Sequence, residues 1–382
     1  MLIAGAILCL VASTAPAPAL SAGRTTFSVS SFGAAGNGIA DDSEIDGDVL
    51  APPGMGYWPK ARRPLQWLNF KWLDGFTIQG TGTVDGQSTL LRSVSPANVS
   101  QHWYISGVKP TLIRFYSSFN VSVRNIRITN SPQCHLKFDS SGGIKVKNIT
   151  ISSPGDSLNT DGIHLQNTRD VDIRSSSIGC GDDCISIQTG CSNVHMKNIN
   201  CNPGHGISLG GLGKDNSLAC VSDVFAEHIN VENALYGVRI KTWQGGKGTV
   251  RNVTFSNVRV ANVATPIAID QFYCDDGGGG ARCGNRSDAV GITGVAYRRV
   301  AGTYTYQPVR LACSDARPCT GVSMADVRLS PASAAGAGGL RQPLCWKSYG
   351  EAMGMIEPTG IACLQRSNGF VMPLTKPFNY TC

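Results

Sequence analysis

A short strand-like unit recurs along this chain. Its core reads apolar-x-apolar, and eight copies begin at Ile113, Leu136, Ile163, Ile185, Ile207, Val238, Ile267 and Val309. A second unit with alternating apolar residues follows each of them, with copies beginning at Val121, Ile144, Val171, Val194, Val224, Val253, Val295 and Val322. Alternating apolar residues predict strands, and a repeat near 22 residues is typical of a solenoid.

One such pair of strands cannot bury its apolar face, but stacked copies share a continuous core. Leucine-rich repeats and parallel β-helices both have a repeat of about this length. The pattern L-x-x-L-x-L-x-x-N is absent and β-branched residues dominate, so the sequence predicts an all-β, single-stranded parallel β-helix. Four asparagines recur at one position of the second unit, where this residue tolerates a left-handed bend. They are Asn125, Asn148, Asn198 and Asn257.

The composition fits a globular protein that is exported. The chain is 42% hydrophobic and 15% charged, which argues against disorder, and no apolar run reaches the ~18 residues of a membrane span. Residues 2–12 are apolar and are followed by small residues, so we expect a signal peptide over residues 1–22. The region before that run lacks Lys and Arg, and a buried N-terminal strand is the alternative. Residues 23–382 are expected to form one β-helix domain.

Cysteines and sequons agree with export. Of the 14 cysteines, Cys9 lies in the predicted signal peptide, and the other 13 suggest about six disulfides and one spare thiol. In a secreted chain, disulfides are favoured over a metal site at Cys180, Cys184 and Cys191. Six N-x-S/T sequons begin at Asn98, Asn120, Asn148, Asn252, Asn285 and Asn379.

The net charge indicates an acidic partner. Lys and Arg number 33 against 26 Asp and Glu, a formal charge of +7. A basic exported protein favours an anionic polysaccharide. Nucleic acid is the less favoured partner, because the basic residues are scattered along the sequence and the chain is expected to leave the cell.

Polar residues occupy matching positions in consecutive repeats. Asp161, Asp183 and His205 each lie two residues before the first apolar residue of a repeat. Because neighbouring strands are ~4.8 Å apart, we expect these side chains to form a ladder on one face. Asp182 must then point in a different direction. Each short motif alone is typical of a turn, and their common register is what indicates a site.

This grouping suits the hydrolysis of a glycosidic bond. One carboxylic acid protonates the leaving oxygen while a carboxylate activates water, and crowding of like charges raises one pKa. In the next repeat, Arg239 and Lys241 flank Ile240. These two cations would hold a substrate carboxylate, Arg239 through a bidentate fork and Lys241 as a point charge.

Four segments resemble the motifs of polygalacturonases, glycoside hydrolase family 28. They are NTDG at 159–162, GDDC at 181–184, GHG at 204–206 and RIK at 239–241. The resemblance covers residues 66–382 and extends to GTGTVDG at 80–86 and to IDQFYCD at 269–275, a plant-like version. It implies a right-handed, pectin-lyase-like β-helix and an enzyme, without cofactor, that cleaves α-1,4 bonds between the galacturonates of pectin with inversion.

The same resemblance implies roles for individual residues. Asp182 matches the general acid, Asp161 and Asp183 the pair that activates water, and His205 the histidine that maintains the protonation of the acid. Arg239, Lys241 and Tyr273 match substrate-binding residues, Cys184 and Cys201 match a disulfide, and no metal is implied. Inversion requires ~6.5–9.5 Å between acid and base, which the different direction of Asp182 must provide. We therefore expect a secreted monomer that acts on pectin in cell wall breakdown and remodelling.

The N-terminal part departs from the family pattern. FSVSSFGA at 27–34 and DDS at 41–43 resemble the opening strand and acidic turn, but IDGDVLAP follows almost directly at 45–52. Several dozen residues of the pattern are missing, so we expect a truncated N-terminal cap, unless the remaining N-terminal residues cap the solenoid in another way. An uncapped end exposes apolar side chains and strand edges, which predicts reduced stability.

Two rival functions stay open. A pectate lyase acts on the same polymer by elimination, but it needs a Ca²⁺ cluster and an arginine base. A truncated relative that only binds pectin is the non-catalytic rival. The sequence does not distinguish attack within the polymer from attack at its end, because that depends on the shape of the loops.

Overall fold

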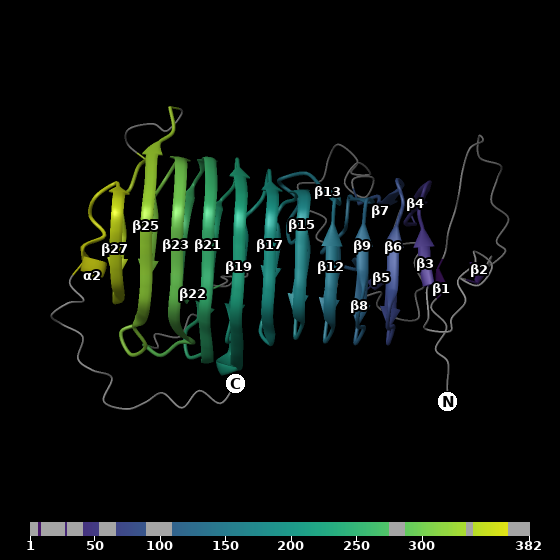
Figure 1. Ribbon diagram of the computed structural model, residues 1–382, viewed down its shortest axis with the longest axis horizontal. Helices are drawn as coiled ribbons and strands as arrows, with labels where there is room; N and C mark the ends of the chain where they lie inside the picture. Colours follow the sequence, from purple (N-terminus) through teal and green to yellow (C-terminus); the bar gives the residue numbers. More distant parts are fainter. Residues whose placement is uncertain are drawn as a thin grey trace, which may run out of the picture.

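The computed structural model describes residues 7–8, 27–28, 41–52, 66–88, 109–274, 287–333 and 339–365. Most described strands stack side by side into two long sheets, one of ten strands and one of fifteen (Figure 1). Every pairing recorded within these two sheets is parallel, for example between residues 163–165 and 185–187. The predicted parallel β-helix is confirmed.

The ten-stranded sheet contains the first strand of each coil. Its members are β5 (Gln66–Lys71), β8 (Thr111–Tyr116), β11 (Leu136–Asp139), β14 (Ile163–Gln166), β16 (Ile185–Ile187), β18 (Ile207–Leu212), β20 (Tyr236–Trp243), β22 (Thr265–Tyr273), β24 (Val309–Ala312) and β26 (Leu344–Trp346).

The fifteen-stranded sheet contains the second strand of each coil. Its main row is β3 (Asp41–Glu44), β6 (Phe76–Gln79), β9 (Ser122–Arg124), β12 (Gly142–Lys147), β15 (Arg169–Gly179), β17 (Cys191–Cys201), β19 (Leu218–Glu232), β21 (Lys247–Val263), β23 (Gly291–Tyr304), β25 (Cys319–Pro331) and β27 (Ser348–Glu357). Beside this row lie β4 (Asp48–Leu50), β7 (Thr83–Asp85), β10 (Arg127–Thr129) and β13 (Thr150–Ser152).

The register of the ten-stranded sheet is the one that the repeat predicts. Ile163 pairs with Ile185, Ile185 with Ile207, and Ile207 with Val238. These residues are fully buried and belong to one apolar core between the two sheets. The core also stacks aromatic rings from successive coils, since Phe115 lies 5.0 Å from Phe70 and 5.3 Å from Phe138 between ring centroids.

The predicted asparagine bends are also present. Asn125, Asn148, Asn198 and Asn257 all have φ between +52° and +62°. In β15, the same bend position belongs to Ser175, with φ of +49°. These bends turn each long strand of the fifteen-stranded sheet, while the residues on either side of a bend keep their parallel partners, so the chain wraps around the core.

Only short elements lie outside the two sheets in the described part of the chain. They are the antiparallel pair β1 (Ile7–Leu8) and β2 (Phe27–Ser28), the 3₁₀-helix η3 (Lys214–Asn216) and the α-helix α2 (Ala362–Gln365). None of the described helices has the length and apolar character needed to cross a membrane. Most of residues 1–40, where the signal peptide and the missing cap were predicted, lie outside the described residues.

The expectation of one spare thiol is wrong. Cys134, Cys180 and Cys191 are all free and buried among the described residues. The disulfides there join Cys184 to Cys201, Cys313 to Cys319 and Cys345 to Cys363, and Cys220 and Cys274 are also disulfide-bonded. An odd count of cysteines shows only that at least one is unpaired, and small apolar thiols pack well in a core without pairing.

Three sequon asparagines lie at the surface. Asn120, Asn148 and Asn252 are exposed on the fifteen-stranded sheet and its turns. The remaining three, Asn98, Asn285 and Asn379, lie outside the described residues. Glycosylation of the chain stays a prediction.

Candidate active site

The site residues come from four consecutive coils of the ten-stranded sheet. Asp161 precedes β14, Asp182 and Asp183 precede β16, and His205 precedes β18, while Arg239 and Lys241 lie within β20. Pairing of Ile163, Ile185 and Ile207 in register places the aspartates and His205 at the same end of three neighbouring strands, next to the cations of β20.

Local sequence explains the shape of each turn. Asn159 takes the left-handed conformation, with φ of +58°, just before the buried Thr160. The hydroxyl of Thr160 donates to the carbonyl of Ser157 (2.8 Å) and accepts the backbone N–H of Gly181 (2.9 Å), which joins the two aspartate-bearing turns. In the next turn, a Cβ on Gly206 would lie 2.2 Å from a backbone oxygen of Gly237, so only glycine fits after His205.

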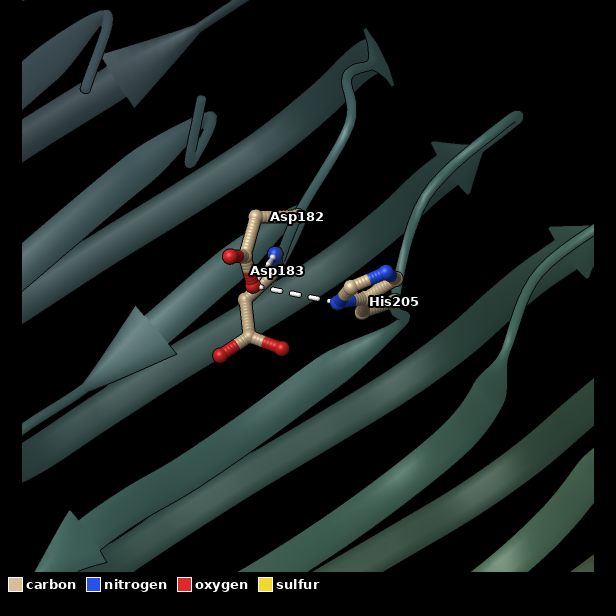
Figure 2. Close-up of side chains that lie close together, drawn as sticks. All are labelled: Asp182, Asp183 and His205. Carbon is tan, nitrogen blue, oxygen red and sulfur yellow. Dashed lines mark hydrogen bonds and ion pairs between the residues drawn. The ribbon is translucent and has the colours of Figure 1, made fainter. Parts of the chain in front are cut away.

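Asp182 and His205 form a close pair (Figure 2). Nδ1 of His205 lies 3.1 Å from Oδ1 of Asp182, and the backbone N–H of Asp183 donates to the same oxygen at 2.8 Å. Both side chains reach solvent, at 20% exposure for Asp182 and 31% for His205. Burial acts to raise the pKa of Asp182, but the hydrogen bond and charge of His205 outweigh it, and the pKa falls below its ordinary value.

Asp183 points away from Asp182 and is buried with two cations (Figure 2 shows the two carboxylates). Its Oδ1 accepts hydrogen bonds from Nη2 of Arg239 (2.6 Å) and from the hydroxyl of Ser208 (2.7 Å), and its Oδ2 lies 3.0 Å from Nζ of Lys241. Nε of Arg239 also donates to Ser208 at 3.1 Å. Asp183 is only 2% exposed, and its single charge offsets one of the two positive charges that the sequence places at the surface.

Asp161 has its own histidine partner. Nδ1 of His164, in β14, lies 3.2 Å from Oδ2 of Asp161, and each side chain is 18% exposed. Burial raises the pKa of Asp161, and the nearby carboxylates of Asp182 and Asp183 act in the same direction, while His164 opposes them. The two partly exposed aspartates of the site therefore differ in pKa, with Asp161 above its ordinary value and Asp182 below it.

A buried histidine supports the turn that carries Asp161. The carbonyl of Asp161 accepts from Nδ1 of His135 at 2.9 Å, while Nε2 of His135 lies 2.7 Å from the hydroxyl of Ser153. A carbonyl can only accept, so Nδ1 carries the proton and Nε2 accepts from Ser153. Burial lowers the pKa of His135 to about 4, which keeps the ring neutral.

Aromatic rings line the side of the cations. Cζ of Arg239 lies 4.0 Å from the centroid of the Tyr236 ring, and Nζ of Lys241 lies 5.4 Å from that of Tyr273. The Tyr273 ring meets Trp243 edge to face at a centroid distance of 5.3 Å. Cations over aromatic faces are stabilised by the ring quadrupole, which helps to fix the orientation of both charged groups.

The disulfide between Cys184 and Cys201 lies directly beneath the histidine turn. A Cβ on Gly204 would lie 2.7 Å from Sγ of Cys184, so the turn rests on the bridge. The pair that the family resemblance implies is thus bonded, and it ties the turn of Asp182 to that of His205.

One group of side chains has the spacing of a metal site. Ligand atoms of Asp182, Asp183 and His205 lie within 4.8 Å of one another. The oxygens of Asp183, however, already accept from Arg239, Lys241 and Ser208, and two cations next to a metal ion would repel it. The donor set therefore fits a metal poorly.

Sequence reasoning places the aspartates, His205, Arg239 and Lys241 together, and the structure also brings them together. The sequence analysis did not predict that His135, His164 and Ser208 take part in the site. It also did not predict that Asp183 holds both cations, which were expected to bind substrate. His164 follows the NTDG segment by two residues, and the strand register aligns it with Ser208. Both lie between two apolar residues of their strand, so the alternating pattern could have predicted that they face away from the core.

Comparison with known proteins identifies the family of the chain. The sequence profile described as glycosyl hydrolases family 28 matches residues 43–338. A probable polygalacturonase of Arabidopsis thaliana is 33% identical over 339 residues, covering 86% of this chain and 72% of that protein. A polygalacturonase of Chamaecyparis obtusa is 38% identical over 300 residues, covering 75% of this chain, but the match spans only 55% of its own length.

Solved structures share the fold. The endo-xylogalacturonan hydrolase of Aspergillus tubingensis superposes with a TM-score of 0.65 at 22% identity, covering 82% of this chain and 85% of that one. A polygalacturonase of Erwinia carotovora gives a TM-score of 0.63 at 22% identity, covering 79% and 83%.

Proposed function

This chain belongs to glycosyl hydrolases family 28, and we propose that it hydrolyses α-1,4 bonds between galacturonate units of pectin with inversion of configuration. The observation that carries the proposal is the pairing of two acid–histidine dyads with a buried Asp183 that holds Arg239 and Lys241. This grouping provides an acid, a base and cations on four neighbouring coils of one sheet.

We assign the general acid to Asp182. It is partly exposed, and it is the carboxyl group that contacts His205. In its protonated form it delivers a proton to the glycosidic oxygen as the bond breaks. His205 holds the carboxyl in place and, when charged, makes Asp182 a stronger acid.

We assign the activation of water to Asp161, with the charge of Asp183 beside it. Asp161 is the more exposed of the two carboxylates, and His164 fixes one of its oxygens. Asp183 has three donors on its two oxygens, so its part is to orient the cations and, through its charge, to raise the pKa of Asp161. This division of labour refines the role that the family resemblance implies for the pair.

Substrate recognition falls to Arg239, Lys241 and Tyr273. Each cation keeps N–H groups that Asp183 does not use, and these would bind the carboxylate of a galacturonate. Tyr273 stands next to Lys241 and would contact the sugar ring. The arrangement disfavours a pectate lyase, because the oxygens of Asp183 already accept hydrogen bonds from two cations, and these cations would repel Ca²⁺.

We also propose that the mature protein is a secreted monomer of the cell wall, with residues 23–382 as one domain after a signal peptide over residues 1–22. Disulfides such as those at Cys184 and Cys313 persist in oxidising compartments, which supports export. The role that follows is breakdown and remodelling of wall pectin.

The test is the release of reducing ends from polygalacturonate by the wild type and by Asp182→Asn. We expect the variant to be slower by about 10²- to 10⁴-fold, the usual contribution of a general acid. Asp170→Asn is the matched control, because Asp170 is exposed on β15, in the other sheet, and asparagine tolerates its positive φ. Equal rates for Asp182→Asn and the wild type would end the hydrolase proposal.

Product analysis tests the two finer points. Proton NMR of the first product should show the anomer opposite to that of the cleaved bond, as inversion requires. Activity should persist in strong chelator and give saturated products, whereas unsaturated products lost on chelation would indicate a lyase.

A further inference from the structure

A polar groove lies on the fifteen-stranded sheet, away from the strands that carry the catalytic residues. Its volume is about 820 Å³. It runs across β17, β19, β21, β23 and β25, which stand side by side in Figure 1. The lining comprises the bend residues Asn198, His228, Asn257, Arg299 and Asp326, and the neighbouring Asn200, Asn230, Val258, Arg259, Ala301 and Arg328. We call this the bend groove.

The bend groove has a regular lining because the solenoid repeats. Each of the five strands contributes its bend residue and the residue two positions later. At ~4.8 Å per strand, the five bends span roughly 19 Å, the length of a short polymer segment and far more than one small anion needs. Amides line one end of the groove, where Nδ2 of Asn230 donates to Oδ1 of Asn200 at 2.9 Å.

The charged side chains in the bend groove are mostly arginines. Arg259 and Arg328 are exposed, and neither has an ion-pair partner among the described residues. Ala301 lies between them in the pairing, so the two arginines stand two strands apart with a small side chain on the strand between them. Arg299 is held by Oδ1 of Asn257 at 2.6 Å, and Asp326 supplies the single acidic group of the lining.

We propose that the bend groove binds a segment of unesterified polygalacturonate and thereby holds the enzyme on its polymer. Guanidinium groups suit the carboxylates of such a chain, and asparagine amides both donate to and accept from sugar hydroxyls. The regular spacing of the groove suits a regular polymer. The identity of the polymer rests on the proposed function, while the requirement for a linear anionic chain rests on the groove itself.

The test compares adsorption to polygalacturonate beads in an Asp182→Asn background, so that the polymer stays intact. Adding Arg259→Gln and Arg328→Gln should weaken adsorption about three- to tenfold at low salt. The matched control adds Arg169→Gln and Arg251→Gln, which remove the same charge from exposed sites outside the lining, and it should bind as the background does. Equal adsorption of the two triple variants would overturn the proposal.

Two further arms identify the ligand. Highly methyl-esterified pectin should bind the groove variant and its control equally, because its carboxylates are masked. The groove variant should bind dextran sulfate almost as tightly as its control does. An equal loss on this sulfated polymer would overturn the assignment to polygalacturonate and make the groove a general polyanion site.

With Asp182 intact, the groove and the catalytic site can be separated. Arg259→Gln with Arg328→Gln should slow hydrolysis of dilute long polymer but leave the rate on a short oligogalacturonate unchanged, because the short chain reaches only the catalytic site. A wild type that adsorbs through the groove but releases no reducing ends would refute the proposed hydrolysis and leave this inference standing. Active enzyme with unaltered adsorption in the groove variant would do the reverse.

Discussion

Nη2 of Arg239 lies 2.6 Å from Oδ1 of Asp183, and both side chains are buried. Lys241 contacts the other oxygen of the same carboxylate at 3.0 Å. The three charges and the hydroxyl of Ser208 form one closed network. Asp183 therefore has two effects: it stabilises the fold, and it holds the two substrate-binding cations in position.

Asp183→Asn should therefore destabilise the protein as well as inactivate it. Removing one partner of a buried ion pair costs about 3–5 kcal/mol, because it leaves the other charge uncompensated. Asp182→Asn should cost far less, since Asp182 is partly exposed and pairs only with His205 in the described site. Guanidinium chloride unfolding of both variants measures the difference, and equal free energies of unfolding would contradict the buried network.

The pKa order of Asp161 and Asp182 predicts an unusual pH profile. The proposed mechanism needs a proton on Asp182 and none on Asp161, but the pKa of Asp161 is raised and that of Asp182 is lowered. The active ionisation state is then a minority of the free enzyme. kcat/KM should rise with pH up to the pKa of Asp182, stay level, and fall above the pKa of Asp161.

His164→Asn tests this order. Loss of the imidazole removes the group that lowers the pKa of Asp161, so that pKa rises further. We expect a lower plateau of kcat/KM and an upper edge of the profile that moves to higher pH. The control is His195→Asn, an exposed histidine of β17 whose loss should leave the profile unchanged. An upper edge that moves to lower pH would refute the assignment of Asp161.

His135 should make stability depend on pH. Its pKa is about 4 in the folded protein, against 6.5 ordinarily, so the unfolded chain binds a proton first as the pH falls. Stability from this group is present above pH 6.5 and declines toward pH 4, by about 3 kcal/mol in total. Unfolding free energies measured across this range should fall less steeply in His135→Asn than in the wild type, and identical slopes would count against the buried neutral ring.

The left-handed bends can be tested at Asn125, whose φ is +62°. Asn125→Ala and Asn125→Gly both lose the hydrogen bond that Asn148 donates to Oδ1, but only alanine suffers steric strain at positive φ. The alanine variant should be less stable than the glycine variant by about 1 kcal/mol. Paired thermal and denaturant unfolding gives this difference, and a more stable alanine variant would show that the bend had relaxed.

The solenoid was predictable because its signals are local and repeated. Ile163, Ile185 and Ile207 fall in register since a strand that slips by one residue would turn its apolar side chains toward water. The positions of Asp161, Asp183 and His205 follow directly from that register. The asparagine bends were readable for the same reason, as each coil repeats the same geometry.

The partners of the site residues were not predictable in the same way. The register aligns Asp183 with His205, but the imidazole bonds to Asp182 instead. Side-chain contacts depend on rotamers and on the depth of each turn, and the periodicity of the sequence does not encode either of these. The three thiols escaped prediction for a related reason, since pairing requires a geometry that a count of cysteines does not contain.

Because the single charge of Asp183 offsets one of the two positive charges of Arg239 and Lys241, an incoming uronate meets a cluster whose long-range attraction is reduced but not removed. Capture at this point combines short-range fit between N–H groups and oxygens with the attraction of the one remaining charge, so affinity there should depend less on ionic strength than it would with two unpaired cations. A neutral methyl ester would then bind more weakly, because it lacks the charge and its carbonyl oxygen is a weaker hydrogen-bond acceptor than a carboxylate.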